Sequence, residues 1–277
     1  MANSAWIGFS LTTSVGWGSS NFLGGYASRR ASPVLLSAIS HLSALTCLLV
    51  ATRTLHTPLP SRHALIWGML AGLVGGVALA ILYGALSTGR MGLASPVVAL
   101  LTVGIPAIAT IMREGSPGVL RLIGFALAIL GTSLIGRTKD KTEKKTLGMA
   151  VLAGCGFAAY SLAIKQAGSG SPLWIDSSSR LAALFVTAAI ALYGGDLRGV
   201  HPRAAVWAAI AGLLDLAGSV AFVRASQLGR LDMVVALSSL GPLVTVLLAI
   251  FLLKERLTFL KAVGVCAALI AIPLIAS

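Results

Sequence analysis

The sequence predicts an all-α membrane protein in which ten transmembrane helices form two inverted repeats of five helices. Composition is the first observation behind this prediction. Hydrophobic residues make up 57% of the chain and charged residues 10%, far below the roughly one-quarter charged fraction of soluble domains. The second observation is that sequence features recur at a constant offset of 140 residues, as Trp67 and Trp207 do. An odd number of spans per copy makes the second copy enter the membrane from the opposite face, as in many secondary transporters.

Each predicted element is an apolar segment long enough to cross a hydrocarbon core, which takes about 20 helical residues. The apolar runs are continuous, which favours helices over the alternating strands of a membrane barrel. The first five segments cover residues 5–26, 33–51, 65–88, 92–112 and 118–136. The second five cover residues 147–167, 173–193, 205–228, 231–253 and 258–276. The first segment lacks the basic start of a signal peptide, so we expect a structural helix there.

The recurrence divides the chain into a first five-helix repeat at residues 1–138, a basic connecting loop at 139–146 and a second five-helix repeat at 147–277. The matching positions are Trp67 and Trp207, Gly72 and Gly212, Gly89-Arg90 and Gly229-Arg230, Gly16 and Gly156, Arg121 and Lys261, and Gly124 and Gly264. The other connections are short, so we expect no extramembrane domain that could carry out chemistry.

The net charge of +13 comes mostly from basic residues in the connections between spans. This placement favours a topology signal and contact with lipid headgroups over nucleic-acid binding. One membrane face receives 13 of them, namely Arg29, Arg30, Arg90, Arg137, Lys139, Lys141, Lys144, Lys145, Arg198, Arg203, Lys254, Arg256 and Lys261. The other face receives 6, namely Arg53, Arg62, Arg113, Arg121, Lys165 and Arg230. The positive-inside rule then predicts a cytoplasmic location for the first face and an outside location for both termini.

The sequence contains no pattern typical of an enzyme or a metal site. Cys47, Cys155 and Cys266 fall within predicted spans without paired spacing, so we expect packing residues and neither disulfides nor zinc. Glycines 72, 75 and 76 form no nucleotide fingerprint, because no strand precedes them. We therefore predict a protein without catalytic activity, metal or cofactor.

Three motifs carry a family resemblance. They are Gly16-Trp17-Gly18-Ser19, then Tyr83-Gly84-Ala85-Leu86 followed by Ala94-Ser95-Pro96, and finally Glu255-Arg256-Leu257-Thr258 followed by Gly264. In order and spacing the chain resembles the drug/metabolite transporter superfamily, in particular its ten-span EamA-domain members, over essentially its whole length. The resemblance implies alternating-access transport of small metabolites, often export, through a central cavity between two inverted halves. It also implies cytoplasmic termini, opposite to the charge count, so the orientation stays open.

Polar residues lie along one face of the first span. Ser10, Thr13, Ser14, Trp17, Asn21 and Gly24 follow steps of three and four, which place them on one side of a helix. The sixth span offers Gly154, Phe157, Ser161 and Lys165, a chemically different wall. Because polar groups facing lipid are costly, these faces predict the lining of a substrate path. The alternative is that Ser and Thr bond the preceding turn or a neighbouring helix.

Two ionisable residues are predicted near the middle of spans. His41 lies in the second span, and Asp215 lies in the eighth with Ser219 and Phe222 on its face. Either could carry a proton in an antiport cycle, since burial and neighbours shift such groups towards neutral pH. The alternatives are an interhelical hydrogen bond or, for Asp215, an ion pair with a basic residue on another helix.

Arg224 is the predicted contact for a substrate carboxylate or phosphate, because guanidinium suits bidentate recognition and residue 224 lies on the opposite side of the helix from Asp215. Lys165 and Arg180 are weaker candidates. Asp176 and Arg180 are four residues apart, and we expect a local salt bridge at the membrane interface.

Two backbone features concern packing and bending. A ridge of small residues with a constant step of four, Gly68, Gly72, Gly76, Ala80 and Gly84, predicts close approach of another helix. Pro96, Pro106 and Pro242 interrupt the fourth and ninth spans and are predicted hinges.

Together these patterns predict a multi-pass secondary active transporter of the cell membrane, an exporter of a small amphipathic metabolite such as an amino acid or related compound. The predicted substrate-binding residues are Trp17, Asn21, His41, Tyr83, Phe157, Ser161, Asp215, Ser219 and Phe222. The expected partners are a small-molecule substrate and the lipid bilayer, and two fused halves are compatible with a functional monomer. A lipid flippase or scramblase and a non-transporting membrane scaffold remain the alternatives.

Overall fold

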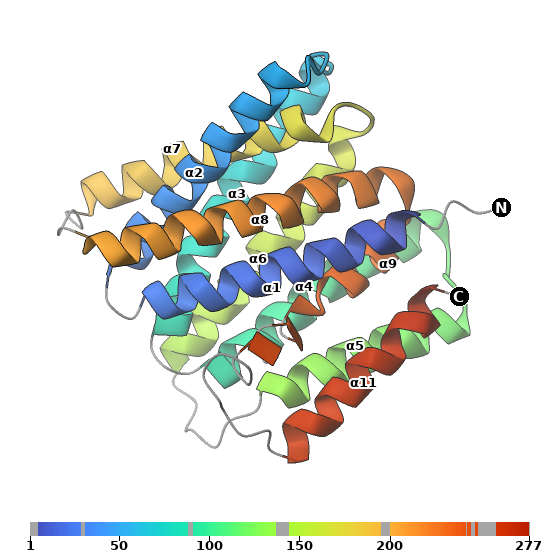
Figure 1. The fold of residues 1–277 in the computed structure, drawn as a ribbon. Helices are drawn as coiled ribbons and strands as arrows, with labels where there is room; N and C mark the ends of the chain where they lie inside the picture. The colour runs from blue at the N-terminus through green and yellow to red at the C-terminus, as the bar shows by residue number, and fades with distance from the viewer. Residues whose placement is uncertain are drawn as a thin grey trace.

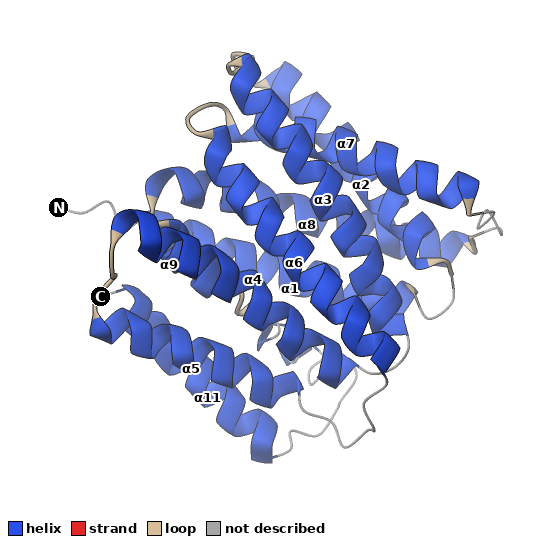
Figure 2. Ribbon diagram, turned by 180° about the vertical axis from the view of Figure 1, so that it is seen from behind, coloured by secondary structure: helices blue, strands red, loops and turns tan. Residues whose placement is uncertain are grey.

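The computed structural model describes residues 5–28, 31–87, 91–136, 144–194, 200–241, 243–244, 247–248 and 259–276. Within these ranges every regular element is an α-helix and no strand is present, as Figure 2 shows. The predicted all-α class is therefore confirmed. Figure 1 shows the helices side by side along one common direction, as expected for segments that must satisfy their backbone hydrogen bonds internally in lipid.

The helices are α1 (Ala5–Ala27), α2 (Pro33–Thr54), α3 (Arg62–Ser87), α4 (Met91–Glu114), α5 (Val119–Gly136), α6 (Lys144–Ala167), α7 (Pro172–Tyr193), α8 (Pro202–Leu228), α9 (Leu231–Ser238) and α11 (Phe259–Ala276). Except for α9, each begins and ends within three residues of a predicted apolar segment. The ninth segment was predicted over 231–253, and much of it lies outside the described residues.

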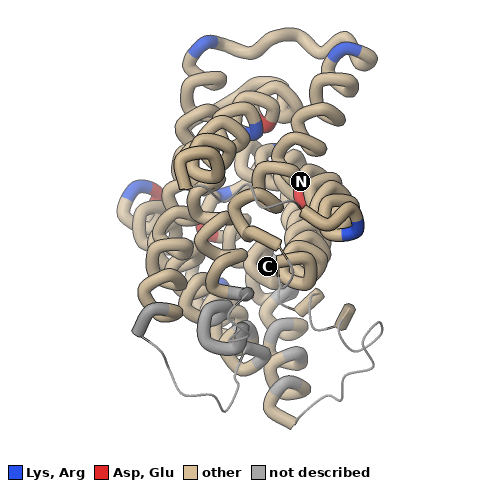
Figure 3. The backbone as a smooth tube through the Cα atoms, turned by 90° about the vertical axis from the view of Figure 1, so that its left-hand side faces the viewer, with Lys and Arg blue, Asp and Glu red and all other residues tan. Residues whose placement is uncertain are grey.

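Length and composition support a membrane location. In the described part of the chain, six helices are long and apolar enough to cross a bilayer, and they are α2, α3, α4, α6, α7 and α8. Helix α1 has 23 residues but is not among them, because Ser, Thr, Gly and Asn lower its hydropathy. Its Ser10, Thr13 and Ser14 are buried within the bundle. Figure 3 shows most described Lys and Arg residues at helix ends, with a few charged residues inside.

Three helices begin with the same local signal. Proline is the first residue of α2, α7 and α8, where its missing N–H would have no partner in the helix anyway. The Ser32 side chain accepts a hydrogen bond from the backbone N–H of Leu35 at 3.3 Å, and His201 caps α8 through the N–H of Arg203 at 3.3 Å. These signals set the starts of the three helices that meet at the site described below.

The glycine ridge of α3 packs against α7, as predicted. A Cβ on Gly68, Gly72 or Gly76 would collide with Ser178, Ser179 or Ala183 of α7, respectively. At Gly72 the obstacle is the backbone carbonyl of Ser179, which has no flexible end that could move aside. The ridge thus lets two helix backbones approach closely.

Some contacts between the two halves of the chain occur twice, at positions that correspond in the two sequence repeats. Gly16 of α1 packs on the backbone of Gly218 in α8, and the equivalent pair of the other repeat, Gly156 of α6 and Ala78 of α3, is also in contact. Gly72 contacts Ser179, and its counterpart Gly212 has a Cβ position that would meet the carbonyl of Ser40 in α2, one residue from the exact counterpart of Ser179. Each half therefore packs against the other through equivalent positions.

The three cysteines contradict the expectation that they pack inside. Cys47, Cys155 and Cys266 are free and exposed on α2, α6 and α11. Composition could not reveal this, because a thiol is apolar enough for a surface that faces lipid as well as for a core.

We expect Gly72→Ala to destabilise the protein by about 1–3 kcal/mol, because the new methyl group overpacks a backbone contact. Gly104→Ala is the matched control in another helix, since a Cβ there meets nothing within 4 Å. The control should be neutral or slightly stabilising, because Ala favours helix by roughly 0.5–1 kcal/mol over Gly. Thermal unfolding of detergent-purified protein measures both, and equal melting temperatures for the two variants would contradict the close α3–α7 contact.

Candidate functional site

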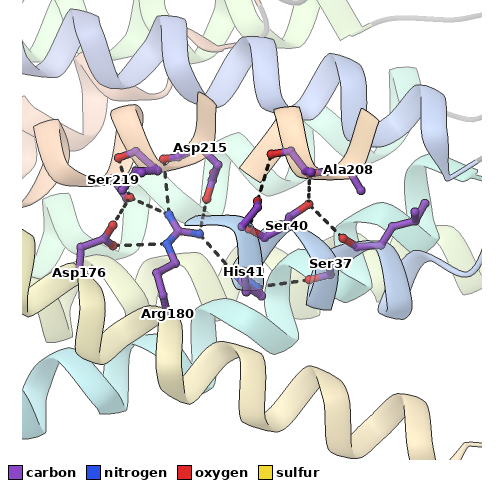
Figure 4. A network of polar contacts seen from close by, with 12 residues as sticks. Ser37, Ser40, His41, Asp176, Arg180, Ala208, Asp215 and Ser219 are labelled. Atoms are coloured by element: carbon purple, nitrogen blue, oxygen red, sulfur yellow. Dashed lines mark hydrogen bonds and ion pairs between the residues drawn. The ribbon is translucent and has the colours of Figure 1, made fainter. Parts of the chain in front are cut away.

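A buried ionic cluster lies where α2, α7 and α8 meet. Asp176 and Arg180 are one turn apart on α7, and Asp215 and Ser219 are one turn apart on α8, so each pair faces the other helix (Figure 4). Arg180 Nη1 forms an ion pair with Asp215 Oδ2, and Arg180 Nε lies 3.6 Å from Asp176 Oδ1. We call these four residues, together with His41 of α2, the Arg180 cluster.

Ser219 links Asp176 to the guanidinium. Arg180 Nη2 donates to Ser219 Oγ at 2.6 Å, and Ser219 Oγ donates to Asp176 Oδ2 at 2.7 Å. Arg180 Nη2 also approaches the backbone carbonyl of Asp215 at 3.4 Å. The planar guanidinium thereby contacts both helices at once, which suits arginine and would not suit lysine.

His41 completes the cluster from the first half of the chain. Arg180 Nη1 lies 3.2 Å from His41 Nδ1, and His41 Nε2 lies 3.3 Å from Ser37 Oγ. A guanidinium can only donate, so Nδ1 accepts and the ring proton sits on Nε2, directed at Ser37. His41 is therefore neutral in this arrangement, and the charges of the cluster belong to Asp176, Arg180 and Asp215.

The cluster is almost fully enclosed. The side chains of Asp176 and Arg180 are 0% and 6% exposed, whereas that of Asp215 is 14% exposed. Burying an ion costs several kcal/mol, and close partners offset this only when the geometry is good. Removing one partner would leave an uncompensated charge inside the bundle. Asp215 is the carboxylate of the cluster that a ligand can reach most easily.

An aromatic group lies further along α8. Phe222 is seven residues, or two turns, from Asp215, and its ring lies 5.1 Å from that of Trp17 and 5.9 Å from that of Tyr160. The Trp17 and Tyr160 rings are 6.4 Å apart in an edge-to-face arrangement. The group combines one residue from the first half of the chain with two from the second. It places a large apolar surface next to the ionic cluster.

Two hydroxyl groups near the cluster are buried without a hydrogen bond of good geometry, although they lie close to each other. They belong to Ser20 of α1 and Tyr83 of α3. Tyr83 packs against Gly24, has the hydroxyls of Ser20 and Ser40 as polar neighbours, and interacts electrostatically with Asp215 and Arg180. Buried polar groups are normally satisfied, so these hydroxyls are candidates for contacts with a ligand.

The structure brings most predicted lining residues into one region. His41, Asp215 and Ser219 share the ionic cluster, Trp17 and Phe222 share the aromatic group, and Tyr83 lies beside the cluster. Other predicted residues have different surroundings. Phe157 packs against the apolar residues around Tyr83, the Ser161 hydroxyl donates to the Phe157 carbonyl one turn earlier at 2.9 Å, and Asn21 is half-buried on α1.

Three hydroxyl groups on the polar face of α1 donate hydrogen bonds to backbone carbonyls of α1 itself, α8 and α9. Ser10 Oγ donates to the Trp6 carbonyl, Thr13 Oγ1 reaches the Gly218 carbonyl of α8 at 3.0 Å, and Ser14 Oγ reaches the Leu237 carbonyl of α9 at 2.5 Å. The packing alternative therefore applies to these three residues. Trp17, one turn further, contacts the aromatic group instead.

Among the basic residues predicted to contact a substrate, Arg180 and not Arg224 lies in the buried cluster. Arg224 is exposed and contacts Gln227 Oε1 at 3.3 Å, whereas Arg180 occupies the buried cluster. Lys165 donates to the carbonyls of Ser226 and Gly229 at 2.8 and 2.9 Å, where it compensates the negative end of α8. The predicted local pair of Asp176 and Arg180 is present, and both side chains are buried.

Tyr160 and Ser20 were absent from the sequence-based candidates. Tyr160 lies one turn after the predicted Phe157, and Ser20 lies one turn before the predicted Gly24 position. Helical spacing could have included both of them. The burial of Asp176 could not be predicted from helical spacing, because it depends on how closely α8 approaches α7.

The predicted hinges are only partly described. Pro96 and Pro106 both lie within α4, which continues through them, and Pro242 lies outside the described residues. The Pro106 carbonyl, which lies one turn before Thr110, accepts a bond from that hydroxyl at 2.8 Å. Across the described ranges, no group of three or more His, Cys, Asp or Glu side chains could hold a metal ion.

Comparison with known proteins gives one family and two relatives. The model of the EamA-like transporter family matches the chain twice, at residues 4–137 and 144–277. A crystal structure described only as that of a protein has the same fold, with a TM-score of 0.82 at 14% identity over 99% of this chain and 98% of that one. An uncharacterized protein of Methanocaldococcus jannaschii is 39% identical over 69 residues, which are 25% of this chain and 50% of that protein. The chain thus spans about half the length of that curated relative.

We expect Arg180→Gln to destabilise the protein by about 3–5 kcal/mol, because two buried carboxylates lose their counter-ion. Arg224→Gln is the matched control, since Arg224 is exposed and its loss should change stability by no more than about 0.5 kcal/mol. Melting temperatures of the two purified variants test this difference. Similar values would mean that the cluster does not depend on the guanidinium.

Proposed function

The chain belongs to the EamA-like transporter family, and we propose on that basis that it is a secondary active carrier that exports a small amphipathic metabolite by alternating access. An amino acid or a related compound is the substrate class that the sequence predicts. The protein is a multi-pass integral membrane protein, which agrees with the family match and with the helices long enough to span a bilayer.

We propose that the two family matches correspond to two inverted five-helix units, at residues 1–138 and 147–277, joined by the loop at 139–146. The paired contacts of Gly16 with Gly218 and of Gly156 with Ala78 support this arrangement, since equivalent positions of the two units meet. Inverted units are the usual basis of alternating access, because rocking exposes a central site to each face in turn.

The Arg180 cluster is the observation that carries the proposal. Ionisable groups inside a membrane protein are costly, and they usually line a substrate or ion pathway. His41 and Trp17 come from the first unit, whereas Arg180, Asp215 and Phe222 come from the second. The polar cluster and the aromatic group thus lie where the two units meet, which is the expected position of a substrate site in a carrier.

Contacts at one end of the bundle support a closed gate there. Arg230 donates to the carbonyl of Gly115 at 2.7 Å and lies 3.8 Å from a carboxylate oxygen of Glu114. On the same face, Trp174 Nε1 donates to the Thr57 carbonyl at 3.0 Å, and His63 Nε2 lies 3.0 Å from the Gln166 carbonyl. Each contact joins the first unit to the second. In the proposed cycle they break when this end opens, while Pro96, Pro106 and Pro242 supply bending points.

The proposal assigns proton coupling to Asp215 rather than to His41. His41 accepts a hydrogen bond from Arg180, so protonating it would place two cations against each other. Asp215 is the more exposed carboxylate, and Arg180 keeps Asp176 as a partner when Asp215 takes a proton. Substrate uptake into proteoliposomes under an imposed pH gradient tests the carrier function. Movement of lipid instead of solute would favour a flippase.

We expect Asp215→Asn to abolish pH-driven transport while leaving the protein folded. The amide cannot exchange a proton, and Arg180 still pairs with Asp176 in this variant. Substrate counterflow without a pH gradient should persist at saturating substrate concentration, which separates the loss of coupling from a loss of folding. Retained pH-driven uptake in the variant would remove Asp215 from the coupling mechanism.

We expect Arg230→Ala to favour opening of the end that carries Gly115 and Gly168. Losing the contacts of Arg230 with Gly115 and Glu114, worth about 1–2 kcal/mol, should shift a two-state equilibrium roughly tenfold. Spin labels at the exposed Ser116 and Ser169, in a protein with its cysteines replaced, would report longer distances in the variant. Arg203→Ala, an exposed change at the start of α8, is the control. An unchanged distance distribution would show that these contacts form no gate.

A further inference from the structure

We propose that the substrate binds as an organic monocation, a protonated amine with an apolar body, whose ammonium group pairs with Asp215 while its apolar part lies against Trp17 and Phe222. This inference rests on the proposed carrier function and narrows its substrate class. It favours amines as substrates over zwitterionic amino acids, a choice that the sequence alone does not make.

The charge balance of the Arg180 cluster carries the inference. Asp176 and Asp215 supply two negative charges, Arg180 supplies one positive charge, and the hydrogen bond from Arg180 holds His41 neutral. When both carboxylates are ionised, the cluster therefore carries an excess of one negative charge inside the bundle. A bound monocation neutralises this excess. A zwitterion leaves it unchanged, and an anion doubles it.

The geometry leaves Asp215 available to an incoming cation. Arg180 contacts Asp176, Ser219 and His41 in addition to Asp215, so the guanidinium stays paired when Asp215 turns to a ligand. Asp176 is completely buried and receives the Ser219 hydroxyl, whereas the Asp215 side chain is 14% exposed. The ligand thus meets a carboxylate first and a guanidinium that already has three other partners.

The surroundings of the cluster also suit an ammonium group. The buried hydroxyls of Tyr83 and Ser20 lie close to each other, and each oxygen can accept a hydrogen bond from an amine. Trp17, Tyr160 and Phe222 offer aromatic rings, which attract cations by their negative faces and accommodate apolar groups at the same time. A carboxylate in the same place would face Asp215 and Asp176 and would be repelled.

The test compares three compounds that share one ring and differ in charge: phenethylamine, phenylalanine and 3-phenylpropionate. Binding to detergent-purified full-length protein at neutral pH is measured by thermal shift and by calorimetric titration. We expect a saturable stabilisation by phenethylamine only. Asp215→Asn should weaken this binding roughly tenfold or more, because each tenfold loss corresponds to about 1.4 kcal/mol and a desolvated charge pair is lost.

Two controls separate the site from a general effect of charge. Arg224→Gln changes an exposed residue on the same helix and should bind phenethylamine as the wild type does. Asp215→Glu keeps the charge and should retain binding better than Asp215→Asn. Equal binding by Asp215→Asn and wild type would overturn the inference.

The outcomes also distinguish this inference from the carrier function on which it rests. Binding and transport of phenylalanine or phenylpropionate in preference to phenethylamine would overturn the cation preference and leave the carrier intact. Binding of phenethylamine without transport in proteoliposomes would support the cation site and contradict the carrier. If none of the three compounds binds, the preference for an aromatic amine is wrong, and transport of any other solute then decides the carrier function alone.

Discussion

The burial of one guanidinium between α7 and α8 is the constraint on which much of the structure depends. Arg180 needs Asp176, Asp215, Ser219 and His41 within reach at once, and these residues come from three helices. The helices can meet only where their backbones approach closely. Gly212 lets α8 lie against the backbone of α2, and Gly72 does the same for α3 and α7. Glycine packing, which carries no chemistry itself, therefore determines whether the ionic cluster can form.

The two halves share a scaffold but not a chemistry. At the offset that relates Trp207 to Trp67, Arg180 corresponds to Ser40, Asp215 to Gly75, Ser219 to Leu79 and Asp176 to Leu36. Ser40 uses its hydroxyl to bond the carbonyl of Ala208 at 2.8 Å, so the equivalent position in the first half links helices without a charge. A symmetric framework with polar groups on one side only presents a ligand with two unlike walls. Such a site can orient a molecule that has one charged end and one apolar end.

The helices were predictable from sequence because continuous apolar runs of spanning length leave the backbone few alternatives. Proline follows Ser32 and Ser171 at two starts that were predicted within one residue, whereas the start of α8 at Pro202 lies three residues before the predicted one. Side-chain depth was harder to predict. The sequence ranked Arg224 above Arg180, yet Arg224 is exposed and Arg180 is buried, because both helices are apolar around most of their circumference and their rotation depends on their neighbours. The exposed cysteines have the same explanation, since in a lipid-facing protein hydrophobicity does not mark the interior.

Helices α5 and α11 lie together at one edge of the bundle, and their bounds, Val119–Gly136 and Phe259–Ala276, are related by the same offset as the two sequence repeats (Figure 1). Two identical chains would meet through such a pairing of one helix with its own counterpart, which is how isologous dimers form. In this single chain the α5–α11 contact therefore has the pattern of an isologous dimer interface. Joining the copies guarantees equal numbers of both halves, and it allows each half to diverge where a homodimer would have to change both subunits together.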